Sequence, residues 1–284
     1  MDAQTVTSPT GTDQSGLFGP DSVTWRVHME PILWVAGFRA LFLQGLHPRV
    51  MRGTYQNSAL FDRKKAWARF ERTTEFVSVR TFGTREEVET YARRVRAIHA
   101  ALVGHDPDTG ETFRLDEPDG LLWVHCGEVD SYVEVSRRAG VLRSDAEADA
   151  YVAESRRAAE VVGIDPADAP SSRAELAAYF ASVRPLLKVT PEARAAVRAA
   201  FDPPLPKELA KLRLAVPPMN VLALSLLPRW ARRMYGLPGL PTTDLAATAA
   251  LVSLRAASRL LPEMPAPERV RRARAVMRAR PRDN

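Results

Sequence analysis

The sequence predicts an all-α fold with a single large helical domain. Apolar residues recur every three to four positions over most of the chain, as in amphipathic or buried helices. The 22 prolines fall mostly between these periodic segments, where short connections are needed. No pair of alternating segments joined by a hairpin turn stands out, and only residues 76–82 are ambiguous between helix and strand. We therefore expect helices joined by short loops.

The first elements are an arm and two helices. Residues 1–19 are rich in Thr, Ser, Gly and Asp, a composition typical of a flexible arm. Residues 31–46 are the most apolar stretch and approach the length of a membrane span. Because Arg39 and Gln44 lie inside it, we interpret this stretch as a buried core helix. A second helix is expected over residues 62–80.

The third helix is predicted over residues 84–103. Thr84 can cap its N-terminus, Glu87 completes a capping box, and Gly104 is a natural left-handed stop. The apolar positions that recur along its predicted buried face are Val88, Tyr91, Val95, Ile98 and Leu102. His99 lies beside this face.

Further helices are expected after a loop at residues 105–110 that is dense in turn-forming residues. One covers residues 121–138, with Asp116 or Asp119 as its N-cap. Three later helix starts are marked by capping residues or by proline in the first turn: Ser144 with Glu147, Ser172 with Glu175, and Thr190-Pro191. The last long helix is expected at residues 243–261.

The domain is expected to cover residues 20–265, and residues 266–284 form a separate basic helix or tail. Seven arginines lie between positions 269 and 282. Such a segment can bind nucleic acid or a membrane surface, or be a helix exposed to solvent. No aromatic residues alternate with the arginines, so we favour the solvent-exposed helix.

Composition narrows the class of protein. Hydrophobic residues make up 45% and charged residues 26%, as in globular proteins. The net charge of +6 is compatible with nucleic acid, an anionic cofactor or an arginine-rich surface; the basic cluster is confined to the C-terminus, which favours the last two. The single cysteine, Cys126, excludes an internal disulfide and a cysteine-based metal cage. No secretory signal is visible, so we expect a cytoplasmic protein without stable membrane insertion.

The sequence lacks the motifs of several classes of enzyme. No His-Glu-x-x-His pair, two-His-one-carboxylate spacing, glycine-rich nucleotide loop or Gly-x-Ser-x-Gly motif is present. The five histidines are His28, His47, His99, His105 and His125. A non-haem metal site, a nucleotide site and a hydrolase triad are therefore not indicated.

What remains is a set of polar residues inside apolar helices. His99 is either a satisfied core residue or, with Arg96 one turn before it, an iron ligand beside a cation. Arg69 and Thr73, four positions apart, share one helix face, although a solvated arginine explains the spacing equally well. His47 is expected to hydrogen-bond at the C-terminus of the helix it follows.

The helix at residues 121–138 carries buried acids. His125 and Glu128 lie on one stripe, with Asp130 close by. Carboxylates at that depth are costly unless paired, so we expect Glu128 and Asp130 to meet arginines such as Arg39 or Arg137.

Together these motifs resemble a known family. In chain order they are Gln44-x-x-His47-Pro48, Arg69-x-x-x-Thr73, Phe82-Gly83-Thr84, Arg96-x-x-His99, Trp123-Val124-His125 and Asp130-Ser131. The combination resembles the helical haem oxygenases that include the rubber oxygenases (latex-clearing proteins) and the oxygenase of mycophenolic acid biosynthesis. The resemblance runs from residue 19 to residue 262. It implies an all-α fold that binds haem b through one proximal histidine.

The resemblance assigns roles to four residues. His99 would be the proximal iron ligand, Arg69 and Thr73 would line the haem pocket as catalytic residues, and Arg96 would lie near the haem edge. These roles agree with the chemistry, because a neutral imidazole is a common haem ligand and haem propionates need arginine partners. The lesser candidates are His47, His125, Gln44, Arg72 and Asp130.

The chain departs from the family in three respects. Rubber oxygenases are secreted, and no signal is visible here. The lysine that precedes their threonine is Arg72 here, whose guanidinium keeps its proton and is a poor iron ligand. Their upstream glutamate base falls on Gly53 by ungapped spacing, although a gap could place Asp62 there. We therefore expect a smaller hydrophobic substrate than polyisoprene.

The sequence thus predicts a haem b-dependent oxygenase that uses O₂ on a hydrophobic small molecule. The apolar wall of the pocket would come from residues 32–46 and the surroundings of Trp123. Two alternatives stay open: a haem-binding sensor or carrier without turnover, and a cofactor-free helical binding protein.

Overall fold

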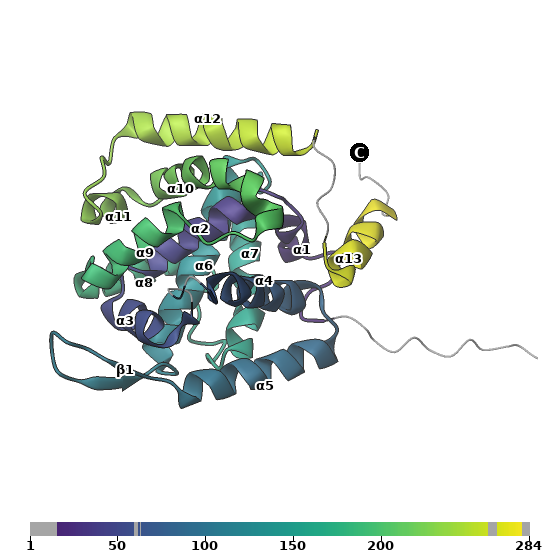
Figure 1. Cartoon of the computed structure of the whole chain (residues 1–284). Helices are drawn as coiled ribbons and strands as arrows, with labels where there is room; N and C mark the ends of the chain where they lie inside the picture. Colours follow the sequence, from purple (N-terminus) through teal and green to yellow (C-terminus); the bar gives the residue numbers. More distant parts are fainter. Residues whose placement is uncertain (1–15, 60–61, 63, 261–265, 280–284) are drawn as a thin grey trace, which may run out of the picture.

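The computed structural model of the chain describes residues 16–59, 62, 64–260 and 266–279. Within them the chain is almost entirely helical, which confirms the predicted all-α fold (Figure 1). Most of the expected N-terminal arm (residues 1–15) and the last five residues of the tail lie outside the described residues. Within the described part of the predicted arm, Phe18 is buried.

The helices are joined mostly by short connections. The first half of the chain contains α1 (Val23–His28), α2 (Leu33–Gln44), α3 (Pro48–Asn57), α4 (Ala66–Phe82), α5 (Arg85–Ala101), β1 (Val103–His105), β2 (Thr112–Arg114), α6 (Pro118–Arg138) and α7 (Asp145–Val161). The second half contains α8 (Arg173–Val183), the 3₁₀ helix η2 (Arg184–Leu186), α9 (Pro191–Phe201), the 3₁₀ helix η3 (Lys207–Leu214), α10 (Val216–Ser225), α11 (Arg229–Met234), α12 (Pro241–Ser258) and α13 (Glu268–Ala279).

The packed pair of α2 and α6 forms the centre of the molecule, with the other helices around it (Figure 1). Leu43 of α2 and Trp123 of α6 are fully buried between them. The indole N–H of Trp123 donates to the carbonyl of Gln44 at 2.9 Å. This position explains why α2 is apolar almost throughout, and it confirms the prediction of a buried core helix.

Several helices start at the capping residues that the sequence predicts. Thr84 and Glu87 form both halves of a capping box at α5. Side-chain caps are also present at Ser144, Ser172 and Thr190. The predicted cap of α6 was wrong: neither Asp116 nor Asp119 is its N-cap. The helix starts instead with Pro118 in its first turn, where proline already has the helical φ.

The sequence predicted no pair of strands, and this prediction was wrong at one place. β1 and β2 form an antiparallel hairpin in which Gly104 lies opposite Phe113. Gly104 therefore does not end α5 in a left-handed conformation; the C-cap is Leu102. A Cβ atom at Gly104 would clash with the ring of Phe113, so close packing explains the glycine. Each strand has only three residues, too few to show an alternating pattern.

The buried face of α5 is shorter than predicted. Val88 and Ala92 in its first half are buried, whereas Ile98 in its last turns is 47% exposed. His99 is half-buried beside it. The C-terminal end of α5 thus lies at the edge of the packed core.

The last two helices pack against different helices. α12 lies across α10, and α13 packs against α4 (Figure 1). In α13, Ala273 is buried and Arg269 forms ion pairs with Glu75 at 2.7 Å and Glu87 at 3.6 Å. The basic segment is therefore a docked helix, not a fully solvated one. Among the described residues, no helix has the length and apolar character needed to cross a membrane.

Candidate functional site

One face of α4 carries a row of polar side chains. Arg69, Thr73 and Arg80 share this face because they are four and seven positions apart. Near the start of the helix, the guanidinium of Arg69 donates to the hydroxyl of Thr73, which confirms that the two share a face. Near its end, the buried Arg80 forms an ion pair with Glu128 of α6. The face thus has a partly exposed end and a buried end.

His99 lies opposite the partly exposed end, on the last turn of α5. Its Nδ1 atom is buried and has no hydrogen-bond partner in the part of the chain that the structure describes. Burial lowers the pKa of the imidazole, and the guanidinium of Arg69 lowers it further, against a smaller opposing effect of Asp116. The ring is therefore neutral at pH 7. A neutral imidazole is the form that binds metal ions.

The structure brings three of the four predicted haem residues together. Arg69 and the exposed Thr73 are hydrogen-bonded on one face of α4, and the charge of Arg69 reaches His99 on α5. Arg96 makes a different contact, because its guanidinium donates to the carbonyl of Val161 at the end of α7, at 3.1 Å. In this structure Arg96 therefore ties α5 to α7.

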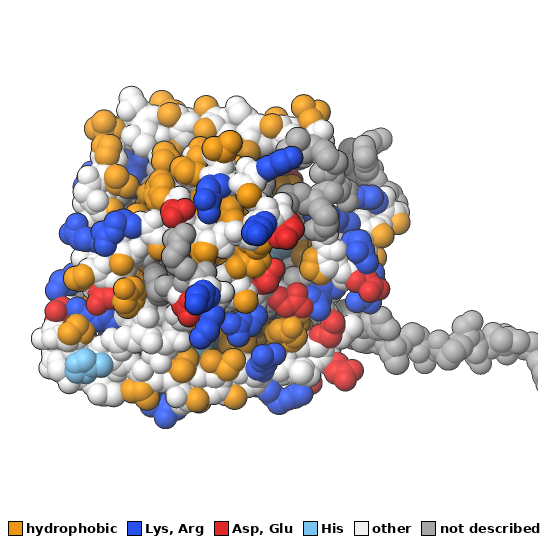
Figure 2. Space-filling view, in the orientation of Figure 1, with side chains coloured by type: hydrophobic (Ala, Val, Ile, Leu, Met, Phe, Trp, Pro, Cys, Tyr) orange, Lys and Arg blue, Asp and Glu red, His pale blue; other side chains and the backbone are white. Residues whose placement is uncertain are grey.

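Aromatic side chains from α2 and α4 lie beside this group. The ring of Phe70, which follows Arg69, stacks against Trp34 at 5.8 Å and Phe38 at 6.3 Å between centroids. Trp34 remains 46% exposed. Figure 2 shows Lys and Arg side chains over the start of α4 with hydrophobic side chains below them, toward α5. Cationic and apolar groups thus border the same region. Trp123, in contrast, belongs to the core.

The buried end of the α4 face contains a second polar group, built around His28 of α1. Its Nε2 lies 2.9 Å from the hydroxyl of Tyr151, and its Nδ1 lies 2.9 Å from the hydroxyl of Thr81. The hydroxyl of Thr81 donates to the carbonyl of Val77, so it must accept from the Nδ1–H of His28. Nε2 then accepts from Tyr151. This arrangement uses a neutral histidine in one defined tautomer.

Charges in this buried group are balanced by Arg80. Burial alone would raise the pKa of Glu128, but the ion pair with Arg80 outweighs it and lowers the pKa. Burial lowers the pKa of His28 to about 3 and that of His125 to about 4. A cavity of about 10 Å³, with room for one water molecule, lies inside the group. Its polar lining residues are Thr24, His28, Arg80, His125, Glu128, Tyr151 and Ser155.

Both buried acids pair with arginines, as predicted, although Arg137 is not one of the partners. Asp130 forms an ion pair with Arg39 at 2.8 Å, as expected. Glu128 pairs with Arg80, which the sequence did not single out, and Arg137 pairs with an acid at the surface. The signal that could have found Arg80 is its spacing from Arg69 and Thr73 on one helix face.

The prediction for His47 was wrong. The side chain of His47 does not bind at the C-terminus of α2; His47 is the N-cap of α3, where its Nδ1 accepts from the N–H of Val50 at 3.4 Å. An N-cap must offer an acceptor, which requires a neutral ring. Burial and the nearby charge of Arg49 lower its pKa accordingly.

The remaining lesser candidates make local structural contacts. The side-chain amide of Gln44 donates to the carbonyl of Val124 at 2.8 Å and joins α2 to α6. Arg72 is exposed and bonds to a carbonyl one turn earlier in its own helix. Among the described residues, no group of three or more His, Cys, Asp or Glu side chains could hold a metal ion.

Comparison with known proteins adds a family. The model of the family described as "ER-bound oxygenase mpaB/B'/Rubber oxygenase, catalytic domain" matches residues 25–261, a span that runs from α1 past the end of α12. Both polar groups on the α4 face lie inside it. No curated protein and no solved structure matches the chain.

Proposed function

The chain belongs to the family of mpaB and rubber oxygenase catalytic domains, and from this premise we propose that it is an oxygenase that depends on haem b and oxidises a hydrophobic small molecule with O₂. The observation that carries the proposal is the placement of His99 on α5 within reach of the positive charge of Arg69 on α4, which lowers the pKa of the imidazole further than burial alone. His99 is neutral and half-buried. Such a side chain fits a proximal histidine, a common protein ligand of haem iron.

Arg69 fits the other requirement of haem, which is a partner for a propionate. The hydrogen bond described for its guanidinium is to the neutral hydroxyl of Thr73. Burial and the nearby charge of Arg72 lower its pKa, so the site disfavours the isolated positive charge. A propionate beside Arg69 would compensate that charge through a charge-assisted hydrogen bond. Thr73 would keep the guanidinium oriented.

Each group of the chain then has a part in the reaction. His99 would hold the iron, Arg69 and Thr73 would orient the propionates, and the aromatic side chains around Phe70 would bind an apolar substrate and exclude water. The bound haem would supply the oxygen chemistry. Arg96 would support the site indirectly, because it holds the last turns of α5 against α7.

The first test is the absorption spectrum of the protein as purified, followed by titration of haemin into apo wild type and His99→Ala. We expect a Soret band in wild type that is lost or displaced in His99→Ala, while far-UV circular dichroism stays helical. His105→Ala is the matched control, because the side chain of His105 is exposed on the adjoining hairpin. An unchanged Soret band in His99→Ala would overturn the assignment. Oxygen uptake with candidate substrates then separates an oxygenase from a haem carrier.

A further inference from the structure

The hairpin is a direct continuation of the helix that carries His99. Only Leu102 separates α5 from β1. The N–H of Leu102 donates to the carbonyl of His99 at 3.2 Å, and its carbonyl accepts from the N–H of Leu115 at 3.1 Å. The last turn of α5 and the hairpin are therefore hydrogen-bonded to each other, and a shift of one moves the other.

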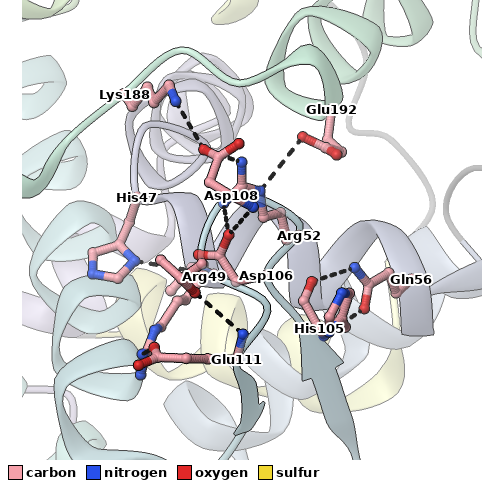
Figure 3. A network of polar contacts seen from close by, with 12 residues as sticks. His47, Arg49, Arg52, Gln56, His105, Asp106, Asp108, Glu111, Lys188 and Glu192 are labelled. Carbon is pink, nitrogen blue, oxygen red and sulfur yellow. Dashed lines mark hydrogen bonds and ion pairs between the residues drawn. The ribbon is translucent and has the colours of Figure 1, made fainter.

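The end of α3 occupies the free edge of β1 (Figure 3). The side-chain amide of Gln56 donates to the carbonyl of His105 at 2.7 Å and accepts from its N–H at 2.8 Å. Asn57 donates to the carbonyl of Val103 at 2.9 Å. These are the bonds that a neighbouring strand would make, so two side chains take the place of a third strand.

The loop of the hairpin is held by a buried arginine (Figure 3). Arg52 of α3 is 2% exposed and forms ion pairs with Asp106 and with Asp108, the latter at 2.6 Å. Lys188 binds the same carboxylate of Asp108 at 2.8 Å. Glu192 adds an acid 4.0 Å from the Nε of Arg52. A buried arginine is costly to leave unpaired, so these contacts resist opening of the loop.

Close packing adds to these polar contacts. A Cβ atom at Gly53 of α3 would lie 3.1 Å from Leu115 and 3.3 Å from the ring of Phe113. The guanidinium of Arg49 lies over the same ring at 5.5 Å. α3 therefore lies flat on the hairpin, with little space between them.

We propose that Gln56 and Arg52 are positioning residues for His99: by holding the hairpin on α3 they set the place of the last turn of α5 and the direction of the imidazole. The inference rests on the proposed function, because it takes His99 as the iron ligand. Metal-binding histidines are usually oriented by a hydrogen bond to their second nitrogen. The buried Nδ1 of His99 has no such partner among the described residues, so the backbone that carries it must be held from outside.

The test compares Gln56→Ala, Gln56→Glu and Arg52→Ala in the full chain. Gln56→Ala removes both bonds to His105, whereas Gln56→Glu keeps the acceptor and loses the donor. Arg255→Ala is the matched control for Arg52→Ala, because Arg255 makes a comparable ion pair with Glu30, at 2.5 Å, that ties α12 to the N-terminal segment. Gln56 is exposed, so its variants keep the test valid if Arg52→Ala fails to fold.

Three measurements are made. Amide hydrogen exchange at residues 98–101 in the apo protein should quicken in Gln56→Ala and Arg52→Ala but not in Arg255→Ala. Haemin affinity should fall about 10-fold in Gln56→Ala, the scale of supporting contacts around a metal ligand, and by less in Gln56→Glu. After reduction, the iron–histidine stretching band of the haem-loaded chain should shift or broaden in Gln56→Ala and stay unchanged in Arg255→Ala.

The outcomes separate this inference from the proposed function. Wild-type exchange and wild-type haemin affinity in Gln56→Ala overturn the inference, as does an equal loss of affinity in Arg52→Ala and Arg255→Ala. If instead His99→Ala binds haemin as tightly as wild type, the proposed function fails. The exchange measurement on the apo protein then still decides whether α3 holds the last turn of α5.

Discussion

The guanidinium of Arg69 on α4 lies close enough to the imidazole of His99 on α5 for its charge to disfavour protonation of the ring. Burial is the main cause of the lowered pKa of His99, and the positive charge of Arg69 lowers it further. A cation beside a histidine disfavours protonation of the imidazole and favours the binding of an anionic cofactor. Four predictions follow from this site and from the contacts that surround it.

The first prediction compares two arginines of α4. Arg69→Ala should lower the affinity of the apo protein for haemin about 10- to 100-fold, because it removes a charge-assisted hydrogen bond to a propionate. Arg72→Ala should leave the affinity unchanged, because Arg72 is exposed and bonds only within its own helix among the described contacts. Haemin titrations followed at the Soret band measure both. Equal affinities in Arg69→Ala and wild type would return Arg69 to the role of a surface arginine.

The second prediction concerns the axial positions of the iron. His47 caps α3 and His125 lies in the buried polar group of Glu128, so each already has a structural place. Arg72 keeps its proton and is a poor ligand. The ferric protein should therefore be five-coordinate or water-ligated, and CO should shift the Soret band after reduction. A low-spin bis-histidine spectrum that CO does not change would favour a carrier or sensor.

The third prediction is that the free energy of unfolding decreases as the pH falls from 7 to 5. The folded chain keeps His28 and His125 neutral, because burial lowers their pKa to about 3 and about 4. In the unfolded chain both histidines take up protons near pH 6.5. The unfolded state therefore binds more protons than the folded state, and lowering the pH stabilises the unfolded state relative to the folded one. Between pH 7 and 5 the loss is about 2 kcal/mol for each histidine. Carboxylates with lowered pKa, such as that of Glu128, act at lower pH.

Urea denaturation at several pH values tests this dependence. His125→Gln should lose about 2 kcal/mol less stability than wild type between pH 7 and 5, because this histidine no longer titrates. His105→Gln is the control, since this side chain is exposed. A free energy of unfolding that is constant between pH 7 and 5 would contradict the neutral buried histidines.

The fourth prediction concerns two glycines with opposite surroundings. Gly104→Ala should destabilise the protein by about 1–3 kcal/mol, because the added Cβ atom would clash with the ring of Phe113. Gly37→Ala, in the middle of α2, meets nothing within 4 Å and should stabilise by about 0.5–1 kcal/mol through helix propensity. Thermal unfolding of both variants measures the difference. Equal melting temperatures would show that the hairpin yields to the extra methyl group.

Local sequence by itself determined the helical character of the chain and most helix starts. The capping box of Thr84 and Glu87 and the Thr190-Pro191 start depend on contacts within one helical turn, so they form wherever that sequence occurs. The contact of Arg69 with Thr73 is equally local. The ordered set of motifs also identified the family, because residue types and their order along the chain can be recognised without any distance in space.

Only the tertiary structure decided which of these residues meet. Arg80 pairs with Glu128, and Gln56 completes the edge of a hairpin whose strands are too short to show a period. The physical reason is the same in each case. A buried charge or an unpaired backbone group needs a partner, and which partner is within hydrogen-bond reach depends on how whole helices pack, which no local spacing encodes.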